Sequence, residues 1–199
     1  LTSIERYASK YQICVVMPSV DNSYYTNNIV GINYFNYVAI ELPKIIENMF
    51  NVSDKCEDRF ICGLSMGGYG ALKVGLTYPN RYHKIASLSG AIDVDRLYST
   101  HMNDPRQKRF EYSFGKFPTK GSKHDIYHLI DQLDKTKKAP GIFLACGTED
   151  FLYSDHLKLK AYLDEKYIEY ENKEVPGGHD WHLWDLFIQD VLIWMFEEK

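Results

Sequence analysis

No stretch of this 199-residue sequence is apolar for long enough to cross a lipid bilayer. The longest apolar clusters are Ile13–Met17 and Val191–Phe196, whereas a spanning helix needs about 20 residues. The chain also lacks a strong excess of one charge, because its net charge is only −4. Such a charge gives no electrostatic reason to bind nucleic acid or an anionic membrane. We therefore expect neither a nucleic-acid partner nor a membrane partner.

Cysteine is scarce as well, and the four residues present show neither metal-binding spacing nor a dense disulfide pattern. Cys14, Cys62 and Cys146 lie in apolar, strand-like runs, where a free thiol behaves as a small hydrophobe. Cys56 lies in a charged loop. The N-terminus does not resemble a secretory signal peptide. Together these features favour a reduced, cytoplasmic protein that holds no metal.

Short apolar strands alternate with helical segments along the chain, which is typical of an α/β fold with a mostly parallel central sheet flanked by helices. The length fits a single domain, residues 1–199. The predicted strands are Ile13–Met17, Arg59–Leu64, Lys84–Ser89, Ile142–Cys146 and Ile168–Val175. The predicted helices are residues 35–49, Met66–Tyr78, Ser154–Tyr167 and Asp180–Phe196. Within the first of these, Pro43 should start or bend the helix.

Residues 93–138 break this alternation. The segment is polar and irregular, and it is rich in aromatic side chains. We interpret it as an insertion over the carboxyl-terminal edge of the sheet. Its pattern fits either a lid or a long surface excursion.

The motif Gly63-Leu64-Ser65-Met66-Gly67 matches the G-x-S-x-G pattern between a predicted strand and a predicted helix. A serine in such a sharp turn projects its hydroxyl away from a strained backbone, and side chains two residues on either side would collide. The glycines at 63 and 67 fit that requirement. The Met66 N–H would face a developing oxyanion at the positive end of the helix. We predict Ser65 as nucleophile and Met66 as oxyanion-hole donor.

Two more glycines, Gly68 and Gly70, extend this cluster into the helix. Each lowers helix propensity by up to about 1 kcal/mol, which is understandable if the helix packs closely on the sheet. The alternative is a glycine-rich turn with an incidental serine. The strand–turn–helix context favours the catalytic interpretation.

A serine hydroxyl needs a neighbouring base, and His179 is the best candidate among seven histidines. It follows a strand and the flexible turn Pro176-Gly177-Gly178, directly before a helix. Asp150 ends the turn after the strand Ile142–Cys146, where an orienting acid should lie. The resulting order of Ser65, Asp150 and His179 is that of α/β-hydrolases.

The sequence resembles an esterase family that includes tributyrin esterases and S-formylglutathione hydrolases (esterase D), within the α/β-hydrolase superfamily. The matching stretches are Cys14–Pro18, Gly63–Ala71, Leu88–Gly90, Cys146–Asp150 and Pro176–Trp181. The resemblance implies that Ser65, Asp150 and His179 form a catalytic triad. It also implies hydrolysis of short-chain acyl esters without a cofactor. The pattern Tyr24-Tyr25-Thr26-Asn27 is similar to the tributyrin-esterase branch.

One departure from the family concerns the N-terminus. Family members begin with strands and a His-Gly-type loop that supplies a second oxyanion N–H, and this chain starts after that region. In the family's sheet the strand before that loop lies between those matching Ile13–Met17 and Arg59–Leu64. Its loss would leave unpaired backbone groups on both sides. We therefore expect a truncated form of a longer protein that lacks the N-terminal strands.

Taken together, the sequence predicts a serine carboxylesterase with a small acyl ester as substrate. Tyr24, Tyr25 and Tyr69 are predicted to line the substrate cleft. Within the hydrolases, the alternatives are a thioesterase of the S-formylglutathione hydrolase type and a peptidase of the prolyl-oligopeptidase type. From another class, the chain would be a non-catalytic binding module. A homo-oligomer is compatible with the sequence, which does not determine the oligomeric state.

Overall fold

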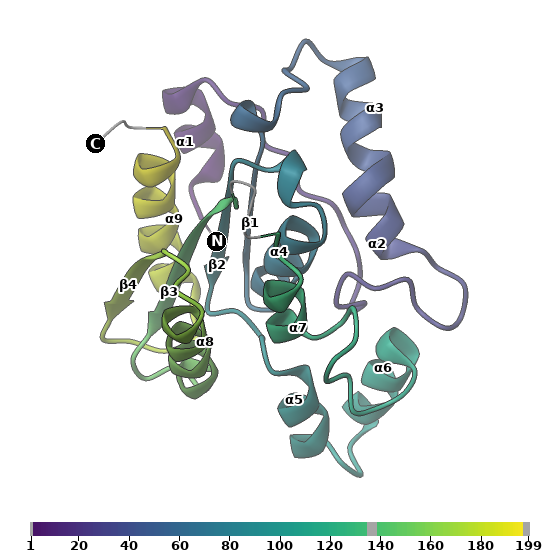
Figure 1. Ribbon diagram of the computed structural model, residues 1–199. Coiled ribbons are helices and arrows are strands. Elements are labelled where there is room, and N and C mark those ends of the chain that lie inside the picture. The colour runs from purple at the N-terminus through teal and green to yellow at the C-terminus, as the bar shows by residue number, and fades with distance from the viewer. Residues whose placement is uncertain (1, 135–138, 197–199) are drawn as a thin grey trace.

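A four-stranded parallel sheet forms the centre of the computed structural model, which describes residues 2–134 and 139–196 (Figure 1). Its strands are β1 (Phe60–Leu64), β2 (Lys84–Leu88), β3 (Gly141–Gly147) and β4 (Glu171–Val175), in the spatial order β1-β2-β3-β4. Each strand pairs in parallel with the next one along the chain. These four strands confirm the predicted α/β class, with boundaries that differ by up to three residues.

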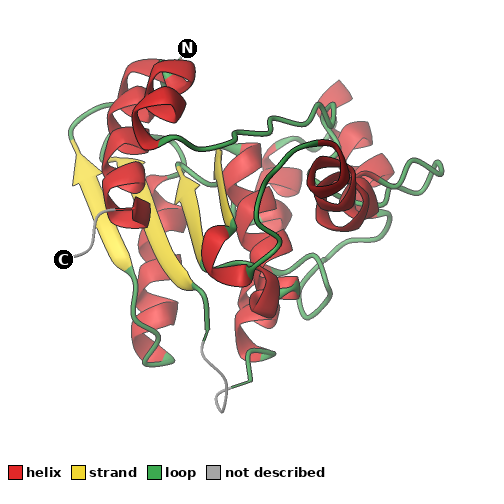
Figure 2. Cartoon of the chain, turned by 90° about the horizontal axis from the view of Figure 1, so that it is seen from above, coloured by secondary structure: helices red, strands yellow, loops and turns green. Residues whose placement is uncertain are grey.

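The helices lie on both faces of the sheet, as the view from above shows (Figure 2). They are α1 (Ile4–Tyr11), α2 (Tyr34–Asn36), α3 (Leu42–Met49), α4 (Met66–Thr77), α5 (Val94–Thr100), α6 (Pro105–Phe114), α7 (Ile126–Asp131), α8 (Tyr153–Glu165) and α9 (Trp181–Phe196). A π-helical turn, Tyr37–Glu41, joins α2 to α3, and short 3₁₀ turns occupy Cys56–Asp58 and Pro79–Arg81. The predicted helices at 66–78, 154–167 and 180–196 are confirmed.

Alternation along the central strands separates two apolar cores. Ile85 of β2 and Ile142 of β3 pack with α4, α7 and α8 in the larger cluster. Their neighbours Ala86 and Phe143 point to the other face and pack against α9. Because both faces are buried, β3 appears in the sequence as a continuous apolar run and β2 as an apolar run interrupted by Ser87.

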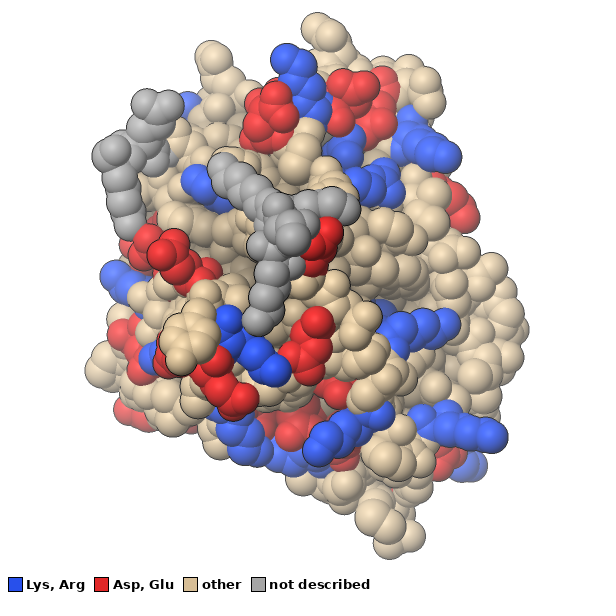
Figure 3. Space-filling model, in the orientation of Figure 1, with Lys and Arg blue, Asp and Glu red and all other residues tan. Residues whose placement is uncertain are grey.

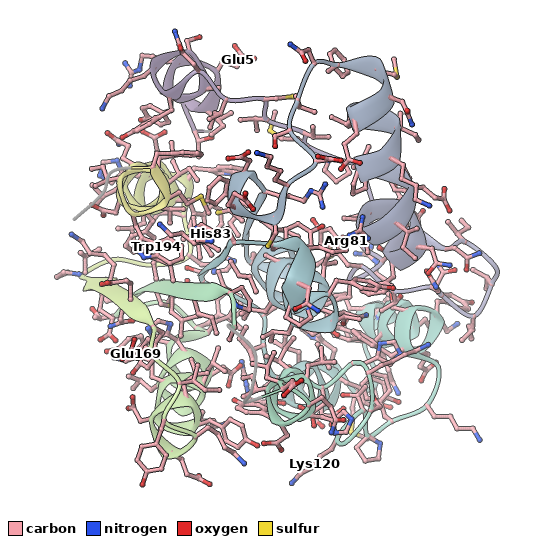
Figure 4. The ribbon with its side chains drawn as sticks, turned by 45° about the horizontal axis from the view of Figure 1, so that its top comes forward. Glu5, Arg81, His83, Lys120, Glu169 and Trp194 are labelled. Carbon is pink, nitrogen blue, oxygen red and sulfur yellow. The ribbon has the colours of Figure 1, made fainter. Side chains whose placement is uncertain are left out.

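Pro43 lies in the first turn of α3, directly after the π-helical turn. Proline has no N–H, so the Ala39 carbonyl four residues earlier cannot receive its usual helical hydrogen bond. The Arg81 guanidinium supplies a substitute, with Nη1 2.6 Å from the Ala39 oxygen. Figure 4 shows Arg81 on the side of the molecule where α3 lies. The predicted change at Pro43 is therefore present, as a switch of helix type.

The prediction of a buried strand at Ile13–Met17 is wrong. This segment is coil, and the exposed fractions of Val15, Val16 and Met17 are 37%, 40% and 71%. It does not belong to the four-stranded sheet, in which β1 is an outer strand. A run of β-branched residues becomes a strand only where a partner strand receives its backbone hydrogen bonds. Cys14 in this segment and Cys62 in β1 are accordingly exposed.

Residues 93–138 contain α5, α6 and α7, in place of the irregular chain that we expected. Aspartates cap all three helices: the carboxylates of Asp93, Asp104 and Asp125 accept hydrogen bonds from backbone N–H groups in the first turns. Aromatic side chains of α6, including Phe110 and Phe114, belong to the main core. Residues 135–138 of this segment lie outside the described residues. Figure 1 places α5 and α6 beyond the end of the sheet at which β2 ends.

An ion pair with a buried carboxylate connects this helical segment to the rest of the protein. Arg96 of α5 donates from Nε (2.9 Å) and Nη2 (2.5 Å) to the carboxylate of Asp155 in α8. The Asp155 side chain has no exposed surface. Since a buried carboxylate is costly without its partner, the pair holds α5 in one position.

Replacing Arg96 with Met should lower the free energy of unfolding by about 3 kcal/mol, because Asp155 would stay buried without its main cation. The matched control is Arg106→Met, which breaks an exposed pair with Asp104 and should leave the stability nearly unchanged. Urea unfolding followed by circular dichroism measures both. Equal stabilities of the two variants would contradict this role of Arg96.

Candidate active site

The backbone turn at Ser65 connects the end of β1 to the first residue of α4. Its torsion angles are φ 53° and ψ −118°, a conformation that is strained for a residue with a side chain. Two hydrogen bonds to the end of β2 and the segment after it hold this turn: Ser65 N–H donates to the Leu88 carbonyl (2.8 Å), and Ala91 N–H donates to the Ser65 carbonyl (3.0 Å). The predicted strand-to-helix turn is therefore present.

Glycines around this turn remove side chains at three close contacts. A Cβ on Gly63 would lie 2.1 Å from the Gly67 oxygen, as the turn requires. A Cβ on Gly68 would lie 2.7 Å from Ser87 Oγ, so Gly68 allows α4 to approach the sheet. Gly70 differs from our expectation, because its Cβ would meet the Tyr25 ring at 2.3 Å and not the sheet.

The surroundings of Gly67 also differ from our expectation that a side chain there would collide with the turn. A Cβ there would meet only Tyr25 Oη, at 3.5 Å, so no collision requires this glycine. Met66 is the first residue of α4. Its N–H therefore has no hydrogen-bond acceptor within the helix. A group bound at Ser65 would meet this donor at the positive end of the helix.

Three predicted site residues meet in one chain of hydrogen-bonding atoms. His179 Nε2 lies 2.9 Å from Ser65 Oγ, and His179 Nδ1 lies 2.8 Å from Asp150 Oδ2. The three residues follow β1, β3 and β4. Because the strands are parallel, their carboxyl ends all lie at the same end of the sheet. An imidazole between a hydroxyl and a carboxylate can take the hydroxyl proton while the carboxylate stabilises its cation.

Asp150 is buried, but its carboxyl group ionises more readily than that of an ordinary aspartate. Burial opposes ionisation, yet hydrogen bonds from His179, from the Leu152 N–H (2.9 Å) and from the Ser89 hydroxyl outweigh it and lower the pKa of Asp150. The carboxylate therefore stays charged at neutral pH. A charged acceptor on Nδ1 keeps the proton on that nitrogen and leaves Nε2 free to accept from Ser65.

Two aromatic side chains enclose the His179 ring. The Phe151 ring lies 4.7 Å away between centroids, and Trp184 meets the imidazole edge-on at 4.8 Å and 89°. Phe151 is 63% exposed, whereas Trp184 is buried. Our sequence analysis missed both contacts. Trp184 shows only the spacing of a core residue, and nothing in the sequence marks Phe151.

Of two predicted cleft residues, Tyr69 is fully buried and Tyr24 is half-buried. Tyr69 has no exposed area, and its hydroxyl donates to the His124 carbonyl at 2.8 Å. The Tyr24 ring packs edge-on against Tyr69, and burial raises the pKa of Tyr24 to about 12. A substrate would not reach the Tyr69 ring without rearrangement, and a cleft-lining role for Tyr24 and Tyr69 stays a prediction.

Tyr25 lies closer to the nucleophile. Its half-buried ring lies against Gly70, while its hydroxyl lies near Gly67 in the first turn of α4. The ring therefore runs along the glycine face of α4 towards the helix start, where Ser65 lies. Tyr24 and Tyr25 both have φ 50°, so the backbone that carries these rings is in the left-handed region, which is unfavourable for non-glycine residues.

Three further features concern metal ligands, helix length and surface charge. Within residues 2–134 and 139–196, no cluster of three or more His, Cys, Asp or Glu side chains could hold a metal ion. None of the described helices is long and apolar enough to span a membrane. Basic and acidic side chains are intermingled on the face shown in Figure 3.

Comparison with known proteins decides the family. The Esterase family model, described as "Putative esterase", matches residues 2–195. The chain belongs to this esterase family. It is 33% identical over 203 residues to the acetyl esterase of Caldicellulosiruptor saccharolyticus, a match that covers 96% of this chain and 75% of that protein.

Solved structures agree with this assignment. The chain is similar to the fluorophosphonate-binding serine hydrolase F (FphF) of Staphylococcus aureus, with a TM-score of 0.91, 36% identity and coverage of 99% of this chain and 76% of that one. The S-formylglutathione hydrolase FrmB of the same organism gives a TM-score of 0.86, 36% identity and coverage of 98% and 76%. This esterase therefore has the α/β-hydrolase fold and is a serine ester hydrolase.

Gly63→Ala in this esterase should lower the free energy of unfolding by about 1–3 kcal/mol, because the new methyl group would overlap the Gly67 carbonyl. Gly178→Ala is the control, since a Cβ there meets nothing within 4 Å. Urea unfolding of both variants measures the difference. If Gly63→Ala were as stable as Gly178→Ala, the close contact would not constrain the turn.

Proposed function

We propose that this esterase is a carboxylesterase that hydrolyses short-chain acyl esters through a triad of Ser65, His179 and Asp150. The observation that carries the proposal is the connected hydrogen-bond chain, 2.9 Å from Ser65 Oγ to His179 Nε2 and 2.8 Å from His179 Nδ1 to Asp150 Oδ2. The family membership and the acetyl esterase relative support ester chemistry.

The reaction would proceed in two acyl-transfer steps. As Ser65 Oγ attacks the ester carbonyl, His179 Nε2 takes its proton, and the Met66 N–H donates to the resulting oxyanion. His179 then protonates the leaving alcohol, which departs and leaves an acyl group on Ser65. In the second step His179 removes a proton from water, which attacks the acyl carbonyl. The bond to Ser65 Oγ then breaks, His179 returns the proton to that oxygen, and the acid is released. Asp150 holds the imidazole orientation and stabilises its cation throughout.

Tyr25 is the predicted cleft residue that best fits a substrate contact. Its hydroxyl lies near Gly67, beside the start of α4, where the acyl group would be held. Tyr24 and Tyr69 would then support the Tyr25 loop, since Tyr24 precedes Tyr25 in that loop and its ring packs edge-on against Tyr69. The ligand in this proposal is a small acyl ester, and the mechanism requires no cofactor.

The triad is tested by hydrolysis of p-nitrophenyl butyrate. Ser65→Ala should lower kcat by about 10⁶-fold and Asp150→Asn by about 10⁴-fold, because the first removes the nucleophile and the second the acceptor that sets the imidazole tautomer. Ser9→Ala, an exposed serine of α1, is the matched control and should keep full activity. A folded wild-type protein without turnover, or an active Ser65→Ala variant, would refute the proposal.

A thioesterase is the second candidate, because FrmB is an S-formylglutathione hydrolase with 36% identity to this chain. The surroundings of His179 favour a neutral leaving group. Exposed Glu149 precedes Asp150, and exposed Asp180 follows His179. These carboxylates would repel the carboxylates of glutathione.

We therefore expect kcat/KM to be higher for p-nitrophenyl acetate than for S-formylglutathione. A neutral acetyl thioester serves as the control, since it separates the effect of sulfur from the effect of charge. Turnover of the neutral thioester but not of S-formylglutathione would support repulsion of the charged leaving group by Glu149 and Asp180. A preference for S-formylglutathione over both acetyl substrates would instead assign the thioesterase function.

A further inference from the structure

Ser89 occupies a strained and fully buried position directly after β2. Its φ is 46° and its exposed fraction is 0%. The Ser89 N–H donates to the Ala145 carbonyl of β3 at 2.7 Å, which continues the β2–β3 ladder by one residue. Glycine would adopt this left-handed backbone without strain. A serine here therefore suggests that its side chain has a use.

The Ser89 hydroxyl contacts the Trp184 indole and contributes to the lowered pKa of Asp150. The Trp184 indole N–H donates to Ser89 Oγ at 3.2 Å, so the hydroxyl acts as acceptor in this contact. Its own proton remains available to a second neighbour. Burial opposes ionisation of Asp150, and the Ser89 hydroxyl is one of the hydrogen-bond donors that outweigh it and lower the pKa of Asp150.

Trp184 in turn contacts the imidazole. Its indole lies perpendicular to the His179 ring at 4.8 Å between centroids, and only 5% of Trp184 is exposed. A buried indole with its N–H engaged cannot easily turn. The contacts thus run from Ser89 through Trp184 to His179, and His179 in turn binds Asp150.

We propose that Ser89 is a positioning residue of the triad, whose hydroxyl fixes the Trp184 indole against His179 and supports the Asp150 carboxylate. Ser89 does not touch substrate, and it acts only through these two side chains. The inference rests on the proposed triad function.

Other titratable groups near the imidazole have separate roles. Asp180, next in sequence to His179, accepts from the N–H groups of His182 and Leu183 at the start of α9. Cys146 of β3 lies beside Ser89, and burial raises the pKa of this thiol to about 12, so it remains neutral. Glu174 of β4 binds Lys160 and Tyr153 of α8. Asp150 is thus the charged group that pairs with His179.

The experiment compares Ser89→Ala and Ser89→Gly in p-nitrophenyl butyrate hydrolysis over a range of pH. Both delete the hydroxyl, but glycine also relieves the backbone strain. We expect kcat to fall about 10- to 100-fold in both variants with KM little changed, as for a lost hydrogen bond to a charged group. The acid limb of the kcat/KM profile should move to higher pH, because an Asp150 with one donor fewer stabilises the imidazolium more strongly.

Trp184→Phe gives an independent variant if the Ser89 variants fold poorly. It keeps an aromatic ring beside His179 but removes the indole donor, so it should lower kcat, and its effect should not add to that of Ser89→Ala. Trp194→Phe is the control on the same helix. Trp194 contacts Lys84 at the start of β2, at the opposite end of the sheet, and Figure 4 shows it near His83.

The outcomes separate the two proposals. An inactive wild-type protein would refute the proposed function itself. If the wild type is active, two results would overturn only the role of Ser89. One is a Ser89→Gly variant with unchanged kcat and an unchanged acid limb. The other is additive effects of Ser89→Ala and Trp184→Phe on kcat. Lower kcat in both Ser89 variants with a displaced acid limb would establish it, because a loss of folded protein changes the amplitude of the profile and not its position.

Discussion

The strained backbone at Ser65 is the constraint on which the rest of the site depends. A residue in such a conformation costs about 1–3 kcal/mol and persists only where the surroundings determine it. Here the Leu88 carbonyl and the Ala91 N–H hold Ser65 from both sides. Since Leu64 pairs with Leu88 in the β1–β2 register, these contacts extend the sheet by one residue. The turn is therefore a product of strand pairing, and the larger apolar core stabilises it indirectly.

Sequence patterns predicted the elements whose burial is encoded locally. β2 and β3 are apolar on both faces, and this property is visible without knowledge of the fold. Ile13–Met17 has the same composition but is coil, because strand formation depends on a partner that local composition does not reveal. The helices within 93–138 were missed for the opposite reason. Their polar surface hid a pattern that was present, namely an aspartate cap before each one.

The candidate site shows the same division. Ser65, Asp150 and His179 follow strands in a recognisable order, so their approach could be predicted from topology. The side chains that surround them could not, because Trp184 lies 95 residues from Ser89 in the chain and the two meet only in the folded protein. The sequence correctly indicated that Gly70 is kept in the helix for a close contact, despite its low helix propensity. The predicted partner was wrong, since the close neighbour is the Tyr25 ring and not the sheet. Local rules thus identify an unusual residue more readily than its partner.

Backbone hydrogen bonds between the turns after β3 and β4 explain why acid and base meet in one geometry. Thr148 N–H donates to the Val175 carbonyl and Glu149 N–H to the Gly177 carbonyl, both at 2.9 Å. The β3–β4 ladder therefore continues through the residues that precede Asp150 and His179. This close approach leaves no room for a side chain at Gly147, whose Cβ would lie 2.2 Å from the Gly177 oxygen. The distance between His179 and Asp150 is consequently set by strand register and by a glycine, so that the two side chains need only adopt their rotamers to bind.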